Sequence, residues 1–102
     1  MENEIKNICK TIVDAVSPVS IIMYSLKYDL SGEKIKAAGF CVVVDGDAQK
    51  AEKQIYLSLD AEFPCDMLVY NSADFAEFTK DPTSYATSIL SKGVLLYGKT
   101  QK

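Results

Sequence analysis

The stretch Phe40-Cys41-Val42-Val43-Val44-Asp45-Gly46-Asp47 carries the clearest structural signal in this chain of 102 residues. Its first five residues form an apolar, largely β-branched run without helical spacing, which predicts a strand. Asp45-Gly46-Asp47 is typical of a turn, and Asp47 is a suitable N-cap for a following helix. We therefore predict a helix over residues 48–59. Its inner face is expected to carry four apolar side chains, Ala48, Ala51, Ile55 and Leu59.

Upstream of this stretch, the sequence predicts a helix, a strand and a polar loop. Apolar residues recur at steps of three and four over residues 3–16, which is the spacing of an amphipathic helix, and Pro18 ends that helix. The β-branched run over 19–24 predicts a strand that lies beside the strand over 40–44 in one sheet. Residues 26–37 are rich in lysines and acids, and we expect them to form a long loop.

Downstream of the same stretch, the pattern predicts two strands with two helices between them. The third strand is expected over 67–70, and a short helix around 73–79. Asp81-Pro82 places a capping acid before a proline, which predicts that the last helix begins there. Gly93 is expected to end this helix before a final strand over 94–97.

The order of these elements predicts the fold class. Helices that alternate with nearly continuous apolar strands are typical of an α/β (α+β) domain, in which a mixed sheet of about four strands has helices packed on it. No linker, repeat or low-complexity segment interrupts the pattern. We therefore expect residues 1–102 to form a single domain of this kind.

The composition limits the chemistry that the chain can perform. All 11 basic residues are lysines, and the sequence contains no arginine, histidine or tryptophan. Catalytic triads, Cys-His pairs, histidine metal ligands and arginine fingers are therefore excluded. The formal net charge of -3 has the wrong sign for a protein whose main ligand is a nucleic acid, so we expect no nucleic-acid partner.

The cysteines and the N-terminal sequence bear on where the protein acts. Cys9, Cys41 and Cys65 are odd in number and have apolar neighbours, so we interpret them as buried free thiols of a reducing compartment. Cys41 and Cys65 would form a redox pair if they were neighbours on adjacent strands, but inert core thiols are the favoured interpretation. No signal peptide is recognisable, and no apolar run approaches the roughly 20 residues of a membrane helix. We expect a cytoplasmic protein without a membrane partner.

Two phrases of the sequence resemble the minimal nucleotidyltransferase domain of the DNA polymerase beta superfamily. They are Phe63-Pro64-Cys65-Asp66-Met67-Leu68-Val69 and Ile89-Leu90-Ser91-Lys92-Gly93-Val94-Leu95-Leu96-Tyr97, within a match that runs from about Pro18 to Gly98. In that family, a first strand ends in Gly-Ser and a second carries Asp-x-Asp. A later strand supplies a third carboxylate. The family's reaction uses these acids to hold two metal ions on a nucleoside triphosphate.

The resemblance implies that the chain has lost this constellation. Ala38 and Phe40 stand at the two Asp-x-Asp positions, and neither side chain can bind a metal. Tyr24-Ser25 stands at the Gly-Ser position. The arginine that the family often has just after it is absent, and Leu26, Lys27 and Tyr28 occupy that stretch. Asp66 matches the third carboxylate. Tyr24, Ser25 and Lys27 are thus the candidate vestigial nucleotide-binding residues, and Asp66 is the candidate vestigial metal ligand.

Three hypotheses follow from the sequence. The first is a non-catalytic, nucleotidyltransferase-like module without a cofactor that binds a protein partner, either a second copy or a helical protein as in the two-protein prokaryotic systems of the resembling family. The second is an active enzyme that transfers a nucleoside monophosphate from a magnesium-bound NTP, with a displaced site built from Asp66 and acids at 29, 45 or 47. The third is an unrelated small α/β domain. The first two hypotheses require Ala38 and Phe40 to face Asp66 across neighbouring strands, and the third is indicated if they do not.

Three lysines around the expected loop offer one further alternative. Lys27, Lys34 and Lys36 would attract phosphate if they converged on one point. Asp29 and Glu33 lie among them, so a solvated loop with balanced charges is the favoured interpretation.

Overall fold

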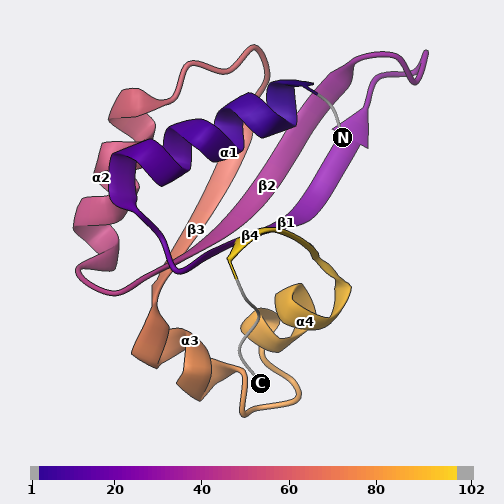
Figure 1. Ribbon diagram of the computed structural model, residues 1–102. Helices are drawn as coiled ribbons and strands as arrows, with labels where there is room; N and C mark the ends of the chain where they lie inside the picture. Colours follow the sequence, from indigo (N-terminus) through magenta and orange to yellow (C-terminus); the bar gives the residue numbers. More distant parts are fainter. Residues whose placement is uncertain (1–2, 99–102) are drawn as a thin grey trace.

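A computed structural model describes residues 3–98, which form four helices and four strands (Figure 1). Each element arises where the sequence has the matching apolar period, 3.6 residues for the helices and an alternating or continuous apolar run for the strands. In chain order they are α1 (Asn3–Val16), β1 (Ser20–Tyr28), β2 (Ile35–Val44), α2 (Ala48–Ser58), β3 (Cys65–Asn71), α3 (Ser72–Phe78), α4 (Tyr85–Lys92) and β4 (Val94–Gly98).

The four strands form one mixed sheet in the order β3-β2-β1-β4. β1 is antiparallel to both of its neighbours, β2 and β4, whereas β2 and β3 run parallel and are connected by α2. The predicted fold class, a mixed sheet of four strands with helices packed on it, is therefore confirmed, and so is the pairing of the first two strands.

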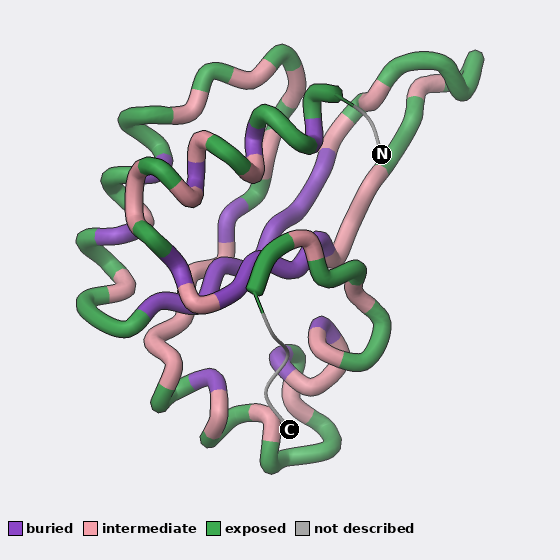
Figure 2. Tube along the Cα trace, in the orientation of Figure 1, coloured by how far each residue is buried: buried purple, intermediate pink, exposed green. Residues whose placement is uncertain are grey.

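One face of the sheet is covered by α1 and α2 and holds the larger core. Successive residues of a strand point to opposite faces, so every second residue of β2 from Ala38 to Val44 enters this core. Twelve buried apolar residues form the cluster, and Figure 2 shows how the buried residues concentrate along the middle of the sheet. They are Ile5, Ile8, Ile12, Ile21, Met23, Ala38, Phe40, Val42, Val44, Ala51, Ile55 and Met67.

The opposite face carries α3 and α4 and a smaller core of six buried residues. Cys41 and Val43 of β2 and Ile22 of β1 contribute from the sheet, and Phe75, Ala86 and Ile89 from the two helices. Tyr24, Leu68 and Tyr70 pack against its margin and are only partly buried. This face therefore combines a small apolar core with side chains that reach solvent.

The prediction of a long loop over residues 26–37 is largely wrong. β1 continues to Tyr28 and β2 already begins at Ile35, so only residues 29–34 form the turn of a β-hairpin that projects from the body of the domain (Figure 1). Leu26 pairs with Ala38 and Lys27 with Ala37. The polar side chains of this segment are accommodated because the hairpin is exposed, and its backbone groups are satisfied by the cross-strand ladder.

The helix boundaries follow the predicted caps with one exception. The Asp47 carboxylate accepts hydrogen bonds from the backbone N–H groups of Gln49 and Lys50, as expected for the N-cap of α2. The predicted start of the last helix at Asp81-Pro82 is wrong, because Asp81 instead closes a turn by accepting from the Thr83 backbone. The N-cap of α4 is Ser84, whose hydroxyl accepts from the Thr87 N–H, and α4 ends at Gly93 as predicted.

The three cysteines do not share one environment. Cys41 is fully buried, whereas Cys9 and Cys65 are only partly buried, which corrects the prediction of three buried thiols. Cys41 belongs to the core under α3 and α4, and Cys65 packs against the core on the other face. The two thiols therefore lie on adjacent strands but on opposite faces of the sheet, so the suggested redox pair is not formed.

The helices of the described segment, residues 3–98, are between 7 and 14 residues long. None of them combines the length and the apolar character that a membrane-crossing helix needs.

Candidate functional site at Tyr24 and Asp66

The structure brings two of the predicted site residues into one row across the sheet. Ser25 of β1 pairs with Gly39 of β2, and Gly39 pairs with Asp66 of β3. Because neighbouring strands lie about 4.8 Å apart, the backbones of Ser25 and Asp66 are separated by about 10 Å. We call Ser25, Gly39 and Asp66 the central row. It lies on the face of the sheet that carries α3 and α4, because Gly39 alternates with Phe40 along β2.

Tyr24 covers the middle of the central row. It is the extra residue of a β-bulge, since Met23 pairs with Phe40 and Ser25 with Gly39. The Tyr24 ring lies directly over Gly39: a Cβ atom added to Gly39 would lie 2.7 Å from both Cε1 and Cζ of this ring. Gly39 is thus required for the ring to pack against the strand, and the ring fills the space above the backbone of β2.

Tyr85 and Asp66 complete the surroundings of the Tyr24 ring. Tyr85 of α4 packs edge-on against it, with ring centroids 6.0 Å apart. Burial raises the pKa of Tyr24 to about 12, and nearby Tyr85 and the Asp66 carboxylate add to this by disfavouring a second negative charge. Tyr24 is therefore a neutral hydrogen-bonding group at physiological pH. A cavity of only about 90 Å³ lies beside the two rings, lined by Tyr24, Tyr85, Ser88, Ile89, Lys92 and Gly93.

The expected position of the Asp-x-Asp residues is wrong in one respect. Ala38 and Phe40 were expected to face Asp66 across neighbouring strands, but both are buried under α1 and α2. Asp66 is opposite Gly39, on the other face of the sheet. This is the arrangement that the third hypothesis, an unrelated α/β domain, predicts. The strand positions that share a face with Asp66 are therefore Gly39 and Cys41, and neither supplies a carboxylate. A shift of one residue along a strand moves a side chain to the opposite face of the sheet, so the sequence alignment placed Ala38 and Phe40 on the wrong face.

Lys27 lies on β1 two residues beyond Ser25, toward the hairpin turn, and is exposed. Lys34 and Lys36 are also exposed on this hairpin. At its turn, the Ser31 hydroxyl donates a hydrogen bond of 2.6 Å to the Asp29 carboxylate, which lowers the pKa of Asp29. These contacts agree with the interpretation of a solvated turn with balanced charges.

The acids that a displaced metal site would use are far from Asp66. Asp45 and Asp47 follow the end of β2, six and eight residues beyond Gly39, which corresponds to about 20 Å or more along the sheet. Asp45 accepts a hydrogen bond of 2.6 Å from the Ser72 hydroxyl, and Asp47 caps α2. Asp29 lies in the hairpin turn. Within residues 3–98, no three His, Cys, Asp or Glu side chains are grouped as a metal ion would require.

The other tyrosines at strand ends, which could in principle stack on a nucleotide base, have structural contacts or lie elsewhere. Tyr70 packs against Phe75 and Phe78, with centroid distances of 5.3 and 5.8 Å. Tyr28 lies in the hairpin and Tyr97 in β4, away from the central row. Sequence reasoning missed Gly39 and Tyr85. The signal for Gly39 was present, because a glycine inside a strand often marks a close approach by another group.

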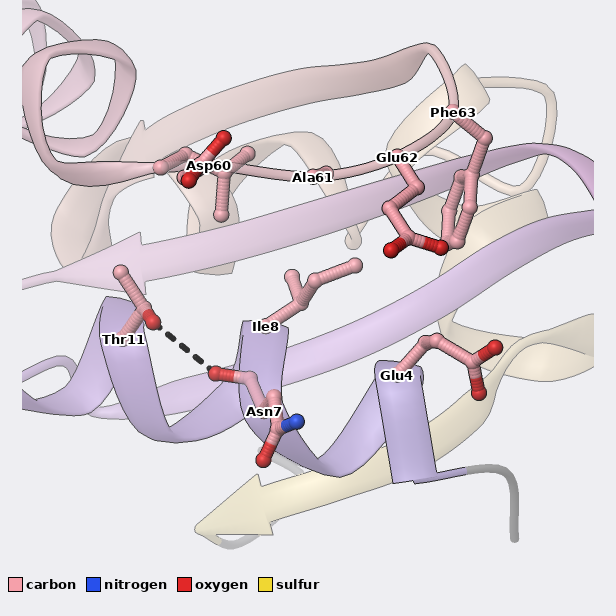
Figure 3. Close-up of a pocket in the computed structure, with 9 residues that line it drawn as sticks. Glu4, Asn7, Ile8, Thr11, Asp60, Ala61, Glu62 and Phe63 are labelled. Atoms are coloured by element: carbon pink, nitrogen blue, oxygen red, sulfur yellow. Dashed lines mark hydrogen bonds between the residues drawn. The ribbon is translucent and has the colours of Figure 1, made fainter.

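A second hollow lies between α1 and the segment that connects α2 to β3 (Figure 3). Its volume is about 150 Å³, and its walls combine apolar side chains with three carboxylates. The Thr11 hydroxyl donates to the backbone carbonyl of Asn7 there, at 2.9 Å. The lining residues are Glu4, Asn7, Ile8, Thr11, Leu59, Asp60, Ala61, Glu62 and Phe63. None of them was among the residues predicted for a site.

Comparisons with known proteins do not identify a family for this arrangement. No family model, no curated protein and no solved structure matches the chain significantly.

Proposed function

We propose that the chain is a nucleotidyltransferase-like module that no longer catalyses nucleotidyl transfer and that acts by binding a protein partner. The observation that carries this proposal is the position of the Tyr24 ring over Gly39, beside Asp66. Transfer of a nucleotidyl group needs open backbone for the phosphates and several carboxylates that converge on the metal ions. In the central row, an aromatic ring covers the backbone, and Asp66 is the one carboxylate.

The resemblance of the sequence supports the nucleotidyltransferase-like part of the proposal, whereas the placement of Ala38 and Phe40 on the face opposite Asp66 favours the alternative of an unrelated domain. The phrases that carry the resemblance form β3 and the α4–β4 unit: β3 and β4 are the two edge strands of the same sheet, and α4 packs on one of its faces. These phrases preserve apolar residues that build the core, such as Met67 and Ile89, rather than groups that react. If the core is kept while an aromatic ring fills the space that a nucleotide would occupy, the chain is expected to act by binding a partner protein at its surface.

Calorimetric titration with ATP, GTP, CTP and UTP, each with Mg²⁺ or Mn²⁺, tests the loss of catalysis. We expect no binding of micromolar affinity to the native chain. The matched variants are Tyr24→Ala, which removes the ring from Gly39, and Asp66→Ala, which removes the carboxylate of the central row. Circular dichroism and two-dimensional NMR spectra establish that each variant is folded.

Metal-dependent binding of a triphosphate by the native chain at micromolar affinity would contradict the proposal, above all if Asp66→Ala abolished it. An assay with radiolabelled ATP and candidate acceptor proteins complements the titration. Transfer of label by the native chain and its loss in Asp66→Ala would establish the displaced catalytic site instead.

A further inference from the structure

The two edges of the sheet differ in how they are protected. β3 is mostly half-buried, packs against α2 and carries the charged Asp66. β4 forms the other edge, and no strand of residues 3–98 pairs with its outer side. Its sequence Val94-Leu95-Leu96-Tyr97-Gly98 contains no charge and no proline, the residues that natural proteins place on edge strands to prevent pairing. Among the described residues 3–98, β4 is therefore a strand edge without protection.

Apolar side chains of β4 are exposed to an unusual extent. Val94 is 51% exposed, and Leu95 and Tyr97 are each 40% exposed. Beside the strand, a groove of about 230 Å³ is lined by Ile5, Lys6 and Cys9 of α1 and by Leu96 of β4. The open edge and this groove are continuous through Leu96, and together we call them the β4 patch. It is defined by Ile5, Lys6, Cys9 and Val94–Gly98.

We propose that the β4 patch binds the same patch of a second copy of the chain, with the two β4 strands antiparallel across a two-fold axis. This inference rests on the proposed function, because it identifies the partner of the module. Free backbone N–H and C=O groups of β4 would pair with their equivalents, as in β-strand addition. A two-fold axis normal to the sheet keeps both α1 helices on one side of the joined sheet. Both grooves then border the contact between the two β4 strands.

The local charge of the patch allows two copies of an acidic chain to meet there. Each chain has a formal net charge of -3, yet the β4 patch contains no carboxylate and only one charged residue, Lys6. Two patches can therefore meet without burying an unpaired acid, and the long lysine side chain can keep its ammonium group in water. The patch offers an apolar groove and protruding apolar side chains together, which suits the self-complementary contact of a two-fold dimer.

The size of the patch sets the expected affinity. β4 has five residues, and the groove extends the contact only to one side of α1. Such a contact belongs to the small class of interfaces, which bury less than about 1,200 Å² and form weak complexes. We expect half of the chains to be dimeric at a concentration on the order of 10–100 µM.

Sedimentation equilibrium over a range from about 5 to 500 µM tests this inference on the full chain. The expected result is a mass that rises from 11.2 kDa toward twice that value. Leu95→Lys should weaken the dimer at least tenfold, because an edge lysine opposes strand pairing. The matched control is Leu57→Lys, the same substitution at a residue of α2 that is 82% exposed and lies outside the patch. It should leave the dimer unchanged, and thermal melts should show both variants folded.

Amide hydrogen exchange adds a readout of the surface that is used. The amides of β4 should become more protected as the concentration of the native chain rises, but not in Leu95→Lys. A monomer throughout the range overturns the inference, as does a dimer that Leu95→Lys leaves intact or that Leu57→Lys weakens equally. A monomer that binds no nucleotide overturns only the second-copy inference. A β4 dimer that binds a metal-dependent triphosphate overturns only the proposed loss of catalysis.

Discussion

The two faces of the sheet are built from the same strands but serve different purposes. The face under α1 and α2 has twelve buried apolar residues, and β2 supplies four of them from Ala38 to Val44. The face under α3 and α4 has six, and its margin is formed by Tyr24, Asp66 and Tyr70, which reach solvent. The first face therefore provides most of the hydrophobic stabilisation, and the second face has room for polar groups.

Because of this difference, the role of a residue in β2 depends on which face of the sheet its side chain points to. Phe40 and Gly39 are adjacent in sequence, but Phe40 is a core residue under α1 and α2, whereas Gly39 supports the Tyr24 ring. A substitution at either position should therefore have an effect that its neighbour does not share. The predictions below test that separation, beginning with the largest expected effect.

Phe40→Asp should abolish the folded state. Phe40 is fully buried, and loss of its ring alone, as in Phe40→Ala, is expected to cost about 3–5 kcal/mol. A buried carboxylate without a partner adds a further penalty. The control is Ser25→Asp, which places a carboxylate at a partly exposed position of the central row and should change the free energy of unfolding by less than about 1 kcal/mol. Urea unfolding followed by circular dichroism measures both, and a folded Phe40→Asp variant would refute the separation of the faces.

Gly39→Ala should have an intermediate effect. The new Cβ would lie 2.7 Å from the Tyr24 ring, so the ring must move, at a cost of about 1–2 kcal/mol. The same substitution in a Tyr24→Ala background should cost about 1 kcal/mol less, which a double-mutant cycle measures as coupling. Gly46→Ala is the matched control, because nothing lies within 4 Å of its added Cβ, and its effect should stay below about 0.5 kcal/mol. Equal costs at the two glycines, or no coupling to Tyr24, would show that the ring does not rest on Gly39.

The titration of the Cys41 thiol should produce the smallest effect, and this effect is visible only at alkaline pH. Burial raises the pKa of the Cys41 thiol from an ordinary value of 9.0 to about 12. The unfolded chain therefore loses this proton at lower pH than the folded chain. The resulting stabilisation is complete below the unfolded pKa and is lost as pH rises toward the folded pKa.

Between pH 9 and pH 10, the free energy of unfolding of the native chain should fall by about 1 kcal/mol more than that of Cys41→Ala. Denaturant titrations at the two pH values measure the difference. Cys9→Ala is a useful control, because Cys9 is only partly buried and on the other face. If the free energy of unfolding changed equally with pH in the native chain and in Cys41→Ala, the Cys41 thiol would not be buried under α3 and α4.

The sequence was most informative where structure depends on neighbours in the chain. The helix over residues 3–16, the Asp47 cap and the end of α4 at Gly93 agree with the predictions, because periodicity and capping act within one or two turns. The hairpin arms were missed because their strand form depends on pairing between residues such as Leu26 and Ala38, which are distant in sequence. Asp81 was misassigned for a related reason: Asp81, Thr83 and Ser84 compete to form local turns and caps.

For the candidate site, the sequence proposed Tyr24, Ser25 and Asp66 as candidates but did not predict their arrangement. By itself it determined most of the elements, the fold class and the absence of arginine and histidine, because these depend on local pattern and composition. Only the tertiary structure decided that Phe40 points away from Asp66, that Tyr24 rests on Gly39 and that β4 is left as an open edge. The physical reason is that side-chain direction in a sheet reverses at every residue, so strand register and bulges determine which side chains meet.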